Sequence, residues 1–164
     1  MPVVPGGQPV LVFLHGFPEG AFVWDALLEH FSAPQNGGYR CVAPNLRGFE
    51  KSSAPSEVSA YRPKFLVQDI AALVAIETGG TQPLACLIAH DWGGAVAWNL
   101  ANQLPELTRK LAIINSPHPG TFLRELKNSV AQQDASAYMK PCPMRCEPER
   151  GPVFPSRNEA EAAI

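Results

Sequence analysis

The sequence predicts an α/β fold in which a mostly parallel sheet is buried between flanking helices. Four apolar runs of strand length recur along the chain, at residues 10–14, 39–43, 84–89 and 110–115. Continuous apolar runs of this kind are typical of parallel strands, because such strands are covered on both faces. Helical patterns lie between the runs, and strands that alternate with helices are the mark of an α/β fold.

Each of the first three runs is followed by a helix of amphipathic pattern, with apolar residues three or four positions apart on one face. These faces consist of Trp24, Leu27, Leu28 and Phe31 after the first strand, Leu66, Ile70, Leu73 and Val74 after the second, and Val96, Leu100 and Leu104 after the third. After about residue 139 the alternation stops. The last 25 residues contain five prolines and are predicted to form irregular structure.

The composition of the chain argues against two classes of partner, nucleic acid and membrane. The net charge of −2 provides no basic patch for nucleic acid, and no apolar run approaches the length of about 20 residues that crosses a bilayer. We therefore expect a small-molecule substrate, with no nucleic-acid or membrane partner. The first ten residues lack the basic and long apolar segments of a secretory signal, which predicts a cytoplasmic location.

The four cysteines do not suggest a metal or a disulfide. Cys41 and Cys86 lie in apolar strand-like runs, where a reduced thiol behaves as a small hydrophobic side chain. Cys142 and Cys146 have a spacing that metal ligands can have, but a closed zinc site needs four ligands and no second Cys/His pair follows. We expect no metal and no cofactor.

The segment "AHDWGG" at residues 89–94 has the strongest chemical signature. In parallel sheets, ligands bind beyond the carboxyl ends of the strands, and this segment begins where the third strand ends. Its order of strand, tight turn and helix matches a nucleophile elbow, with Asp91 in the nucleophile's place and Gly93 allowing the chain to reverse. His90 belongs to the same turn.

An aspartate at an elbow implies attack by a carboxylate. With an ordinary pKa near 4, Asp91 is already ionised at neutral pH and can attack an alkyl carbon directly. The resulting ester must then be hydrolysed through an oxyanion, which needs two backbone N–H donors. Trp92, directly after the nucleophile, would supply one of them.

The segment "LHGFPEG" at residues 14–20 would supply the second donor. The Phe17 N–H is free to point inward, Gly16 allows unusual backbone geometry, and Pro18 stiffens the loop. His15 is expected to brace this loop by hydrogen bonds rather than to act as a base. Glu19 is expected either to line the cavity entrance or, more commonly for this residue type, to face water.

Four motifs in order, "HGFPE", "APNLRGFEKSSAP", "AHDWGGAVAW" and "INSPHPGTF", resemble the α/β-hydrolase superfamily and most closely its soluble epoxide hydrolase-like branch. The resemblance covers about residues 10–139. It implies a partial α/β-hydrolase core at 1–118, and a region at 119–164 that holds the start of a helical cap and an irregular tail. It also implies Asp91 as nucleophile, Phe17 and Trp92 as oxyanion-hole donors, and Tyr138 as the cap residue that protonates the epoxide oxygen.

The resemblance also implies a relay acid and a base histidine after the cap, and neither has a match in these 164 residues. His15, His30, His90 and His118 all fall outside the family's base position. We therefore expect an epoxide hydrolase-type reaction, in which water should hydrolyse the Asp91 ester poorly, on a truncated core of four contiguous strands. Asn45 and Arg47 are expected to brace a loop.

Two alternatives remain open. A haloalkane or haloacid dehalogenase would use the same carboxylate to displace halide, with the Trp92 indole N–H as a halide donor, although Phe17 offers no side-chain donor. The chain could also be an inactive hydrolase fragment, whose motifs survive without function. The substrate would be a small apolar epoxide or halogenated compound.

Overall fold

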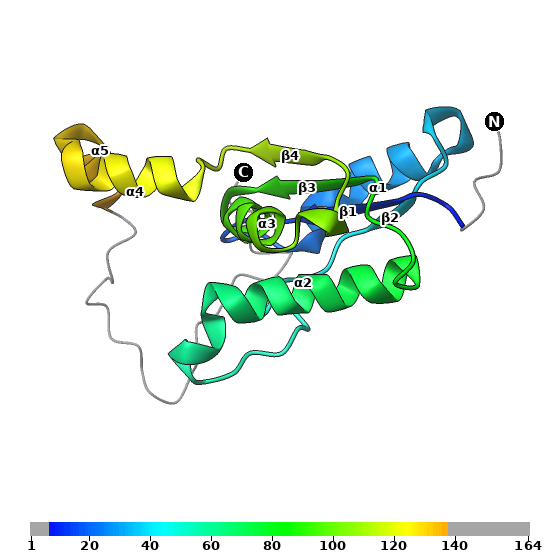
Figure 1. Cartoon of the computed structure of the whole chain (residues 1–164), viewed down its shortest axis with the longest axis horizontal. Coiled ribbons are helices and arrows are strands. Elements are labelled where there is room, and N and C mark those ends of the chain that lie inside the picture. The colour runs from blue at the N-terminus through cyan, green and yellow to red at the C-terminus, as the bar shows by residue number, and fades with distance from the viewer. Residues whose placement is uncertain (1–6, 138–164) are drawn as a thin grey trace.

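The computed structural model describes residues 7–137 and places a four-stranded parallel sheet at the centre of the fold (Figure 1). The strands are β1 (Val10–Leu14), β2 (Arg40–Val42), β3 (Cys86–His90) and β4 (Leu111–Ile114). Their order in the sheet is β2-β1-β3-β4, and each neighbouring pair is parallel. The predicted fold class is therefore confirmed, together with the four contiguous strands.

Within the described residues, three helices cover the two faces of this sheet and two more follow them in the chain (Figure 1). They are α1 (Asp25–Ser32), α2 (Pro63–Thr78), α3 (Asp91–Gln103), α4 (Pro119–Asn128) and α5 (Val130–Ala135), with short 3-10 turns at Ala21–Trp24, Pro34–Asn36, Val58–Tyr61 and Pro105–Leu107. In Figure 1, α2 and α3 lie on one side of the sheet and α1 lies on the other. The arrangement leaves the carboxyl ends of the strands, where the motifs begin, in one row of loops.

The central strand β1 shows why an unbroken apolar run was required. Side chains alternate between the two faces of a strand, so both faces of β1 need apolar residues. Val12 and Leu14 belong to the core beneath α2 and α3, whereas Leu11 and Phe13 pack with Trp24 and the α1 side. All five residues of β1 are buried.

Several boundaries differ from the sequence prediction, and the physical reason is clear for two of them. The run at residues 84–89 is in the sheet only from Cys86, because Leu84 makes an isolated bridge to Thr108 ahead of the regular ladder. Trp24 lies in the 3-10 turn before α1, and its ring packs against Phe13 with ring centroids 5.5 Å apart. The apolar pattern thus identified most residues of the two core clusters, whereas Leu27 of the predicted helical face is 38% exposed and the start of the helix was placed less accurately.

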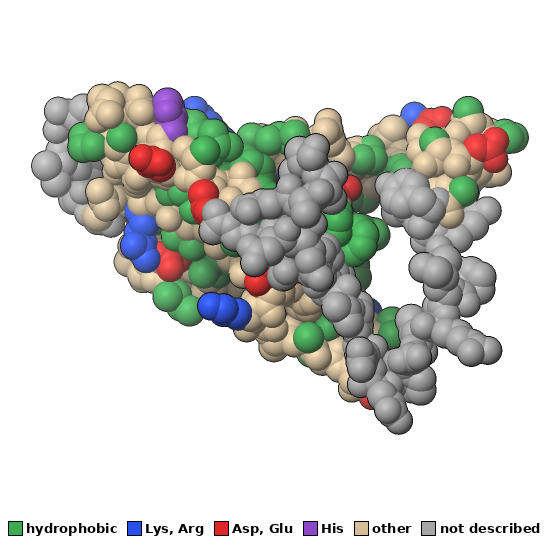
Figure 2. Space-filling view, turned by 180° about the vertical axis from the view of Figure 1, so that it is seen from behind, with side chains coloured by type: hydrophobic (Ala, Val, Ile, Leu, Met, Phe, Trp, Pro, Cys, Tyr) green, Lys and Arg blue, Asp and Glu red, His purple; other side chains and the backbone are tan. Residues whose placement is uncertain are grey.

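The α4–α5 arm, residues 119–135, extends away from the sheet (Figure 1). Neither helix contains a buried residue. Figure 2 shows apolar and charged side chains mixed on the surface of this arm. Within residues 7–137, no helix has both the length and the apolar character that a membrane crossing needs. The division into 1–118 and 119–164 remains a prediction.

Candidate active site

The loops after β1 and β3 lie side by side because these strands are neighbours in register. Leu14 pairs with Ala89, so His15 and His90 both stand at the carboxyl edge of the sheet. The chain then turns directly into α3 at Asp91. This pairing brings together two segments that are separated by more than 70 residues in the sequence.

Asp91 sits at the tip of the turn between β3 and α3, with a left-handed backbone conformation at φ +49°. Such a conformation is uncommon for residues other than glycine, although Asp and Asn adopt it more readily than most. The next turn of α3 lies close against β1. A Cβ atom at Gly93 would come within 2.5 Å of the His15 carbonyl oxygen and 2.6 Å of the Leu14 carbonyl oxygen, so only glycine fits.

The Phe17 amide contacts the Asp91 carboxylate. Its N–H donates to Asp91 Oδ1 at 3.0 Å. Gly16 makes this approach possible, because a Cβ atom there would lie 2.6 Å from the Cβ of Asp91. Pro18 follows Phe17 through a cis peptide bond. The structure thus places the predicted donor loop against the predicted nucleophile.

The side chains of Phe17 and Trp92 are both half-exposed, at 52% and 50%. The two residues therefore present their rings at the mouth of the site. Trp92 directly follows Asp91 at the start of α3. Its N–H is the second predicted donor, and that role remains a prediction.

His15 is fully buried and bonded at both ring nitrogens. The Leu46 amide donates to Nε2 at 3.0 Å, and Nδ1 lies 2.9 Å from the Gly16 carbonyl oxygen. Because an amide can only donate, Nε2 is the acceptor and Nδ1 carries the hydrogen. Burial lowers the pKa of His15 below its ordinary value of 6.5, and the bond to the Gly16 carbonyl only partly opposes this. A neutral imidazole thus joins the loops after β1 and β2.

Glu19 takes a part that the sequence did not reveal. One carboxylate oxygen, Oε2, accepts from the Gly16 N–H at 3.3 Å and lies 3.0 Å from Nδ1 of His90. The Glu19 side chain is 31% exposed, so it faces water in part, and neither expectation for it included these two contacts. The sequence shows only that Glu19 and His90 each lie near the end of a predicted strand. Their contact becomes predictable only when β1 and β3 are known to be neighbours in the sheet.

The loop after β2 is held by the two residues expected to brace it. The Asn45 carboxamide oxygen accepts from the Ala21 N–H at 2.7 Å. Arg47 forms a two-pronged ion pair with Asp69 of α2, at 2.7 and 2.8 Å, and also donates to the Ala60 carbonyl oxygen. These contacts confirm the bracing prediction, and they fix one wall of the site.

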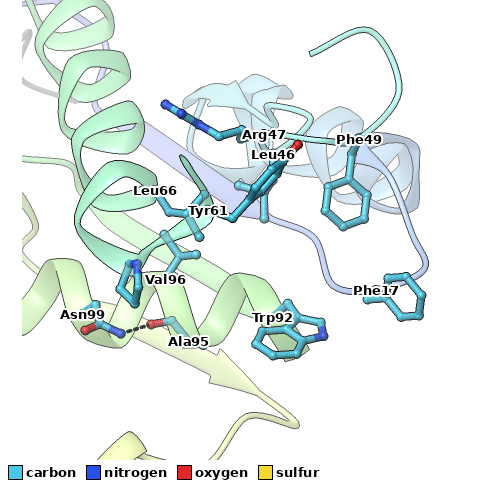
Figure 3. Close-up of a pocket in the computed structure, with 11 residues that line it drawn as sticks. Phe17, Leu46, Arg47, Phe49, Tyr61, Leu66, Trp92, Ala95, Val96 and Asn99 are labelled. Atoms are coloured by element: carbon cyan, nitrogen blue, oxygen red, sulfur yellow. Dashed lines mark hydrogen bonds between the residues drawn. The ribbon is translucent and has the colours of Figure 1, made fainter. Parts of the chain in front are cut away.

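Two cavities adjoin Trp92 and Ala95. The smaller, of about 180 Å³, is lined by Asp91 and by the segment after β4, including Asn115 and Phe122. The larger, of about 470 Å³, is mostly apolar, and Asp91 does not line it. Figure 3 shows the larger cavity, with Phe17 and Trp92 at one end and Asn99 at the other. Of these two cavities, the smaller one is therefore the cavity that gives access to the Asp91 side chain.

Some predicted residues lie outside the described part of the chain. Tyr138, Cys142 and Cys146 are among them. Cys41 and Cys86 are free thiols, and burial raises the pKa of both. Among residues 7–137, no group of three or more His, Cys, Asp or Glu side chains could hold a metal ion.

Residues 9–138 match the family model described as the alpha/beta hydrolase fold. Among curated proteins, the chain is 37% identical over 132 residues to epoxide hydrolase 3 of Xenopus tropicalis, covering 80% of this chain and 34% of that protein. It is 43% identical over 111 residues to the AB hydrolase superfamily protein YfhM of Bacillus subtilis, covering 68% of this chain and 37% of that one. The chain spans about a third of the length of these relatives.

Solved structures give the same picture. An epoxide hydrolase of Bacillus megaterium, in complex with an inhibitor, superposes with a TM-score of 0.72 at 38% identity, over 82% of this chain and 45% of that one. Epoxide hydrolase VrEH1 of Vigna radiata has a TM-score of 0.59 at 40% identity, over 66% of this chain and 33% of that one.

Proposed function

Because the chain belongs to the α/β-hydrolase family and is epoxide hydrolase-like within it, we propose that Asp91 is the nucleophile of an epoxide-opening reaction. The observation that carries this proposal is the Phe17 N–H donating to Asp91 Oδ1 at 3.0 Å, on a turn that holds Asp91 at the carboxyl edge of the sheet. This bond distinguishes the two carboxylate oxygens, since Oδ1 is held while Oδ2 can attack.

In the first step Oδ2 forms a bond to an epoxide carbon as that carbon's bond to the ring oxygen breaks. The electron pair of the broken bond remains on the oxygen, which stays bonded to the neighbouring carbon and takes up a proton to become a hydroxyl group. The product is a hydroxyalkyl ester of Asp91. Tyr138 is the proposed proton donor on the strength of its sequence motif, and it lies outside the described residues.

In the second step water attacks the ester carbonyl carbon, and negative charge develops on Oδ1. The Phe17 N–H already bonds this atom before the reaction, so the donor needs no rearrangement to stabilise the oxyanion. Trp92 N–H is the proposed second donor. Collapse of the oxyanion then releases a diol and restores the carboxylate.

This second step is expected to be slow in the 164-residue chain, because none of its four histidines matches the position of the family's base. His15 is held by Gly16 and Leu46, His90 by Glu19, His30 by Asn36, and His118 by the Gly120 N–H at the start of α4. We therefore propose that the ester on Asp91 accumulates rather than turning over.

The apolar lining of the larger cavity suggests an apolar substituent on the substrate. Four aromatic residues contribute to it, namely Phe17, Phe49, Tyr61 and Trp92. An aryl epoxide such as styrene oxide would place its reactive carbon at Asp91 and its ring toward these side chains. Such a site is typical of small-molecule recognition, where apolar surface supplies affinity and few polar groups set orientation.

The test is intact-protein mass spectrometry after incubation with styrene oxide. We expect the mass to rise by the full mass of the epoxide, since ring opening adds every atom of the substrate, and peptide mapping should locate the gain at Asp91. Asp91→Asn should show no gain, because a carboxamide is a far weaker nucleophile. An unmodified wild-type mass, or equal modification of Asp91→Asn, would contradict the proposal.

The dehalogenase alternative rests on Trp92, whose indole lies beside Asp91 in the smaller cavity. Incubation with a 1-haloalkane would distinguish it, because displacement releases halide and leaves an alkyl ester without a hydroxyl group. The inactive-fragment alternative predicts neither adduct. It also predicts no cooperative thermal transition, whereas a folded domain should unfold cooperatively.

A further inference from the structure

We infer that Glu19 and His90 form a clamp that positions the Phe17 amide over Asp91, so that Glu19 is a positioning residue for the proposed reaction. The clamp consists of the Glu19 carboxylate, the His90 ring and the Gly16 N–H. This inference rests on the proposed function for its kinetic consequence. Its structural content, a tie between two loops, stands on the contacts alone.

The contacts converge on a single oxygen atom. Oε2 of Glu19 accepts from the Gly16 N–H at 3.3 Å and from His90 at 3.0 Å. Because a carboxylate can only accept, Nδ1 of His90 must carry the hydrogen. Glu19 thereby bridges the loop after β1 and the last residue of β3.

The clamp lies next in the chain to both residues of the bond between Phe17 and Asp91. Gly16 directly precedes the Phe17 amide, and His90 directly precedes Asp91. The clamp thus lies one residue from each partner of the bond between Phe17 N–H and Asp91 Oδ1, on the same two segments. The turn is further closed by the Glu19 N–H, which donates to the Gly16 carbonyl oxygen at 3.2 Å.

The two side chains of the clamp are partly shielded from water, so water competes less for their hydrogen bonds. The side chains of Glu19 and His90 are 31% and 26% exposed. The Phe17 residue, in contrast, is half-exposed. Without the carboxylate, Gly16 would lose its partner for the N–H and the loop could swing away from Asp91.

The clamp predicts a specific kinetic signature in the alkylation of Asp91 by styrene oxide. In Glu19→Ala, the maximal alkylation rate should fall roughly 10- to 100-fold, the range expected when a reacting group is displaced by about 1 Å. The apparent dissociation constant of the epoxide should not change, because Glu19 does not line either cavity beside Trp92. A purely structural role would instead lower the melting temperature and leave the rate per folded molecule unchanged.

A conservative replacement of Glu19 should restore the alkylation rate. Glu19→Gln retains one carboxamide oxygen that can accept from both Gly16 and His90, so its rate should return close to that of the wild type. The double variant Glu19→Ala/His90→Ala should be no slower than Glu19→Ala, because both changes break the same clamp. The matched control is Glu77→Ala, which removes an ion-paired carboxylate beside Arg40 at the opposite end of β1 and should alkylate normally.

A second measurement does not depend on any substrate. Amide hydrogen exchange by NMR should show the Gly16 and Phe17 N–H groups protected in the wild type, in Glu19→Gln and in Glu77→Ala, and exposed in Glu19→Ala. Absence of an adduct in the wild type would overturn the proposed function, while this exchange pattern would still support the clamp. Equal exchange in wild type and Glu19→Ala, or an unchanged alkylation rate in Glu19→Ala, would overturn the clamp.

Discussion

The Asp91 turn and the α4–α5 arm differ in how closely they pack against the rest of the molecule. At the turn, backbone meets backbone, with Gly93 of α3 against the carbonyl oxygens that end β1 and Phe17 bonded to Asp91. In the arm, no helical residue is buried, and Leu123 and Val130 are 57% and 71% exposed. Asp91, the proposed nucleophile, is therefore positioned by the strands of the sheet, whereas the arm extends away from the sheet (Figure 1).

This contrast separates the proposed reaction into two parts with different structural support. The proposed attacking carboxylate of Asp91 and the proposed Phe17 donor lie where the loops after the paired strands β1 and β3 meet. The proposed acid, Tyr138, follows the arm in sequence and lies outside the described residues. We expect substitutions at the junction to affect both stability and chemistry, and substitutions on the arm's surface to leave stability nearly unchanged.

The largest difference is expected between two leucines. Leu87 is fully buried in β3, whereas Leu123 is exposed on α4. Leu87→Ala should lower the free energy of unfolding by about 2–5 kcal/mol, because it leaves a cavity in the core, and Leu123→Ala by less than about 0.5 kcal/mol. Urea denaturation followed by circular dichroism measures both. Similar losses for the two variants would show that the arm packs more firmly than its exposure indicates.

Two glycines give the next contrast. Gly93→Ala brings a methyl group within 2.6 Å of two backbone oxygens, so α3 must shift away from β1 at a cost of about 1–3 kcal/mol. It should also abolish the alkylation of Asp91. Gly120→Ala in α4 meets only the exposed His118 ring at 3.4 Å and should be neutral or stabilising by up to about 1 kcal/mol. Thermal unfolding and the mass assay, run on both, would reveal any departure from this order.

A smaller effect should appear in the pH dependence of stability. Burial lowers the pKa of His15 in the folded state, so the unfolded state binds a proton more readily below pH 6.5. Stability should therefore be complete above about pH 6.5 and decline as the pH falls, by at most about 1.4 kcal/mol per pH unit. Denaturation midpoints between pH 5 and 7.5 measure this slope. It should vanish in His15→Gln and persist in His118→Ala, and a slope retained in His15→Gln would assign it to another group.

The sequence predicted the fold well because local pattern and burial coincide here. The run at residues 10–14 appears as β1 without change, since every residue in it must be apolar to be covered on both faces. The helical faces through Ile70 and Val96 likewise lie in the core. Boundaries were less accurate at Cys86 and Trp24, where a bridge and a 3-10 turn depend on neighbouring segments.

The candidate site was only partly predictable. The motif around Asp91 and the loop around Phe17 could be singled out, because each carries its own signature of small residues after an apolar run. The contact between Glu19 and His90 could not, since 71 positions separate the two residues and their proximity follows only from the pairing of β1 with β3. The pairing of strands in the fold thus determines which polar residues contribute to the site.

The left-handed backbone of Asp91 has a consequence for what sequence variation position 91 can accept. Conformational energy alone favours Gly there, while Asn and Asp adopt this region more easily than the remaining residues. A library randomised at position 91 and selected for thermal stability should thus enrich Gly above Asn and Asp, while selection for alkylation should return Asp. The two selections would therefore favour different residues at position 91, Gly for stability and Asp for the proposed alkylation.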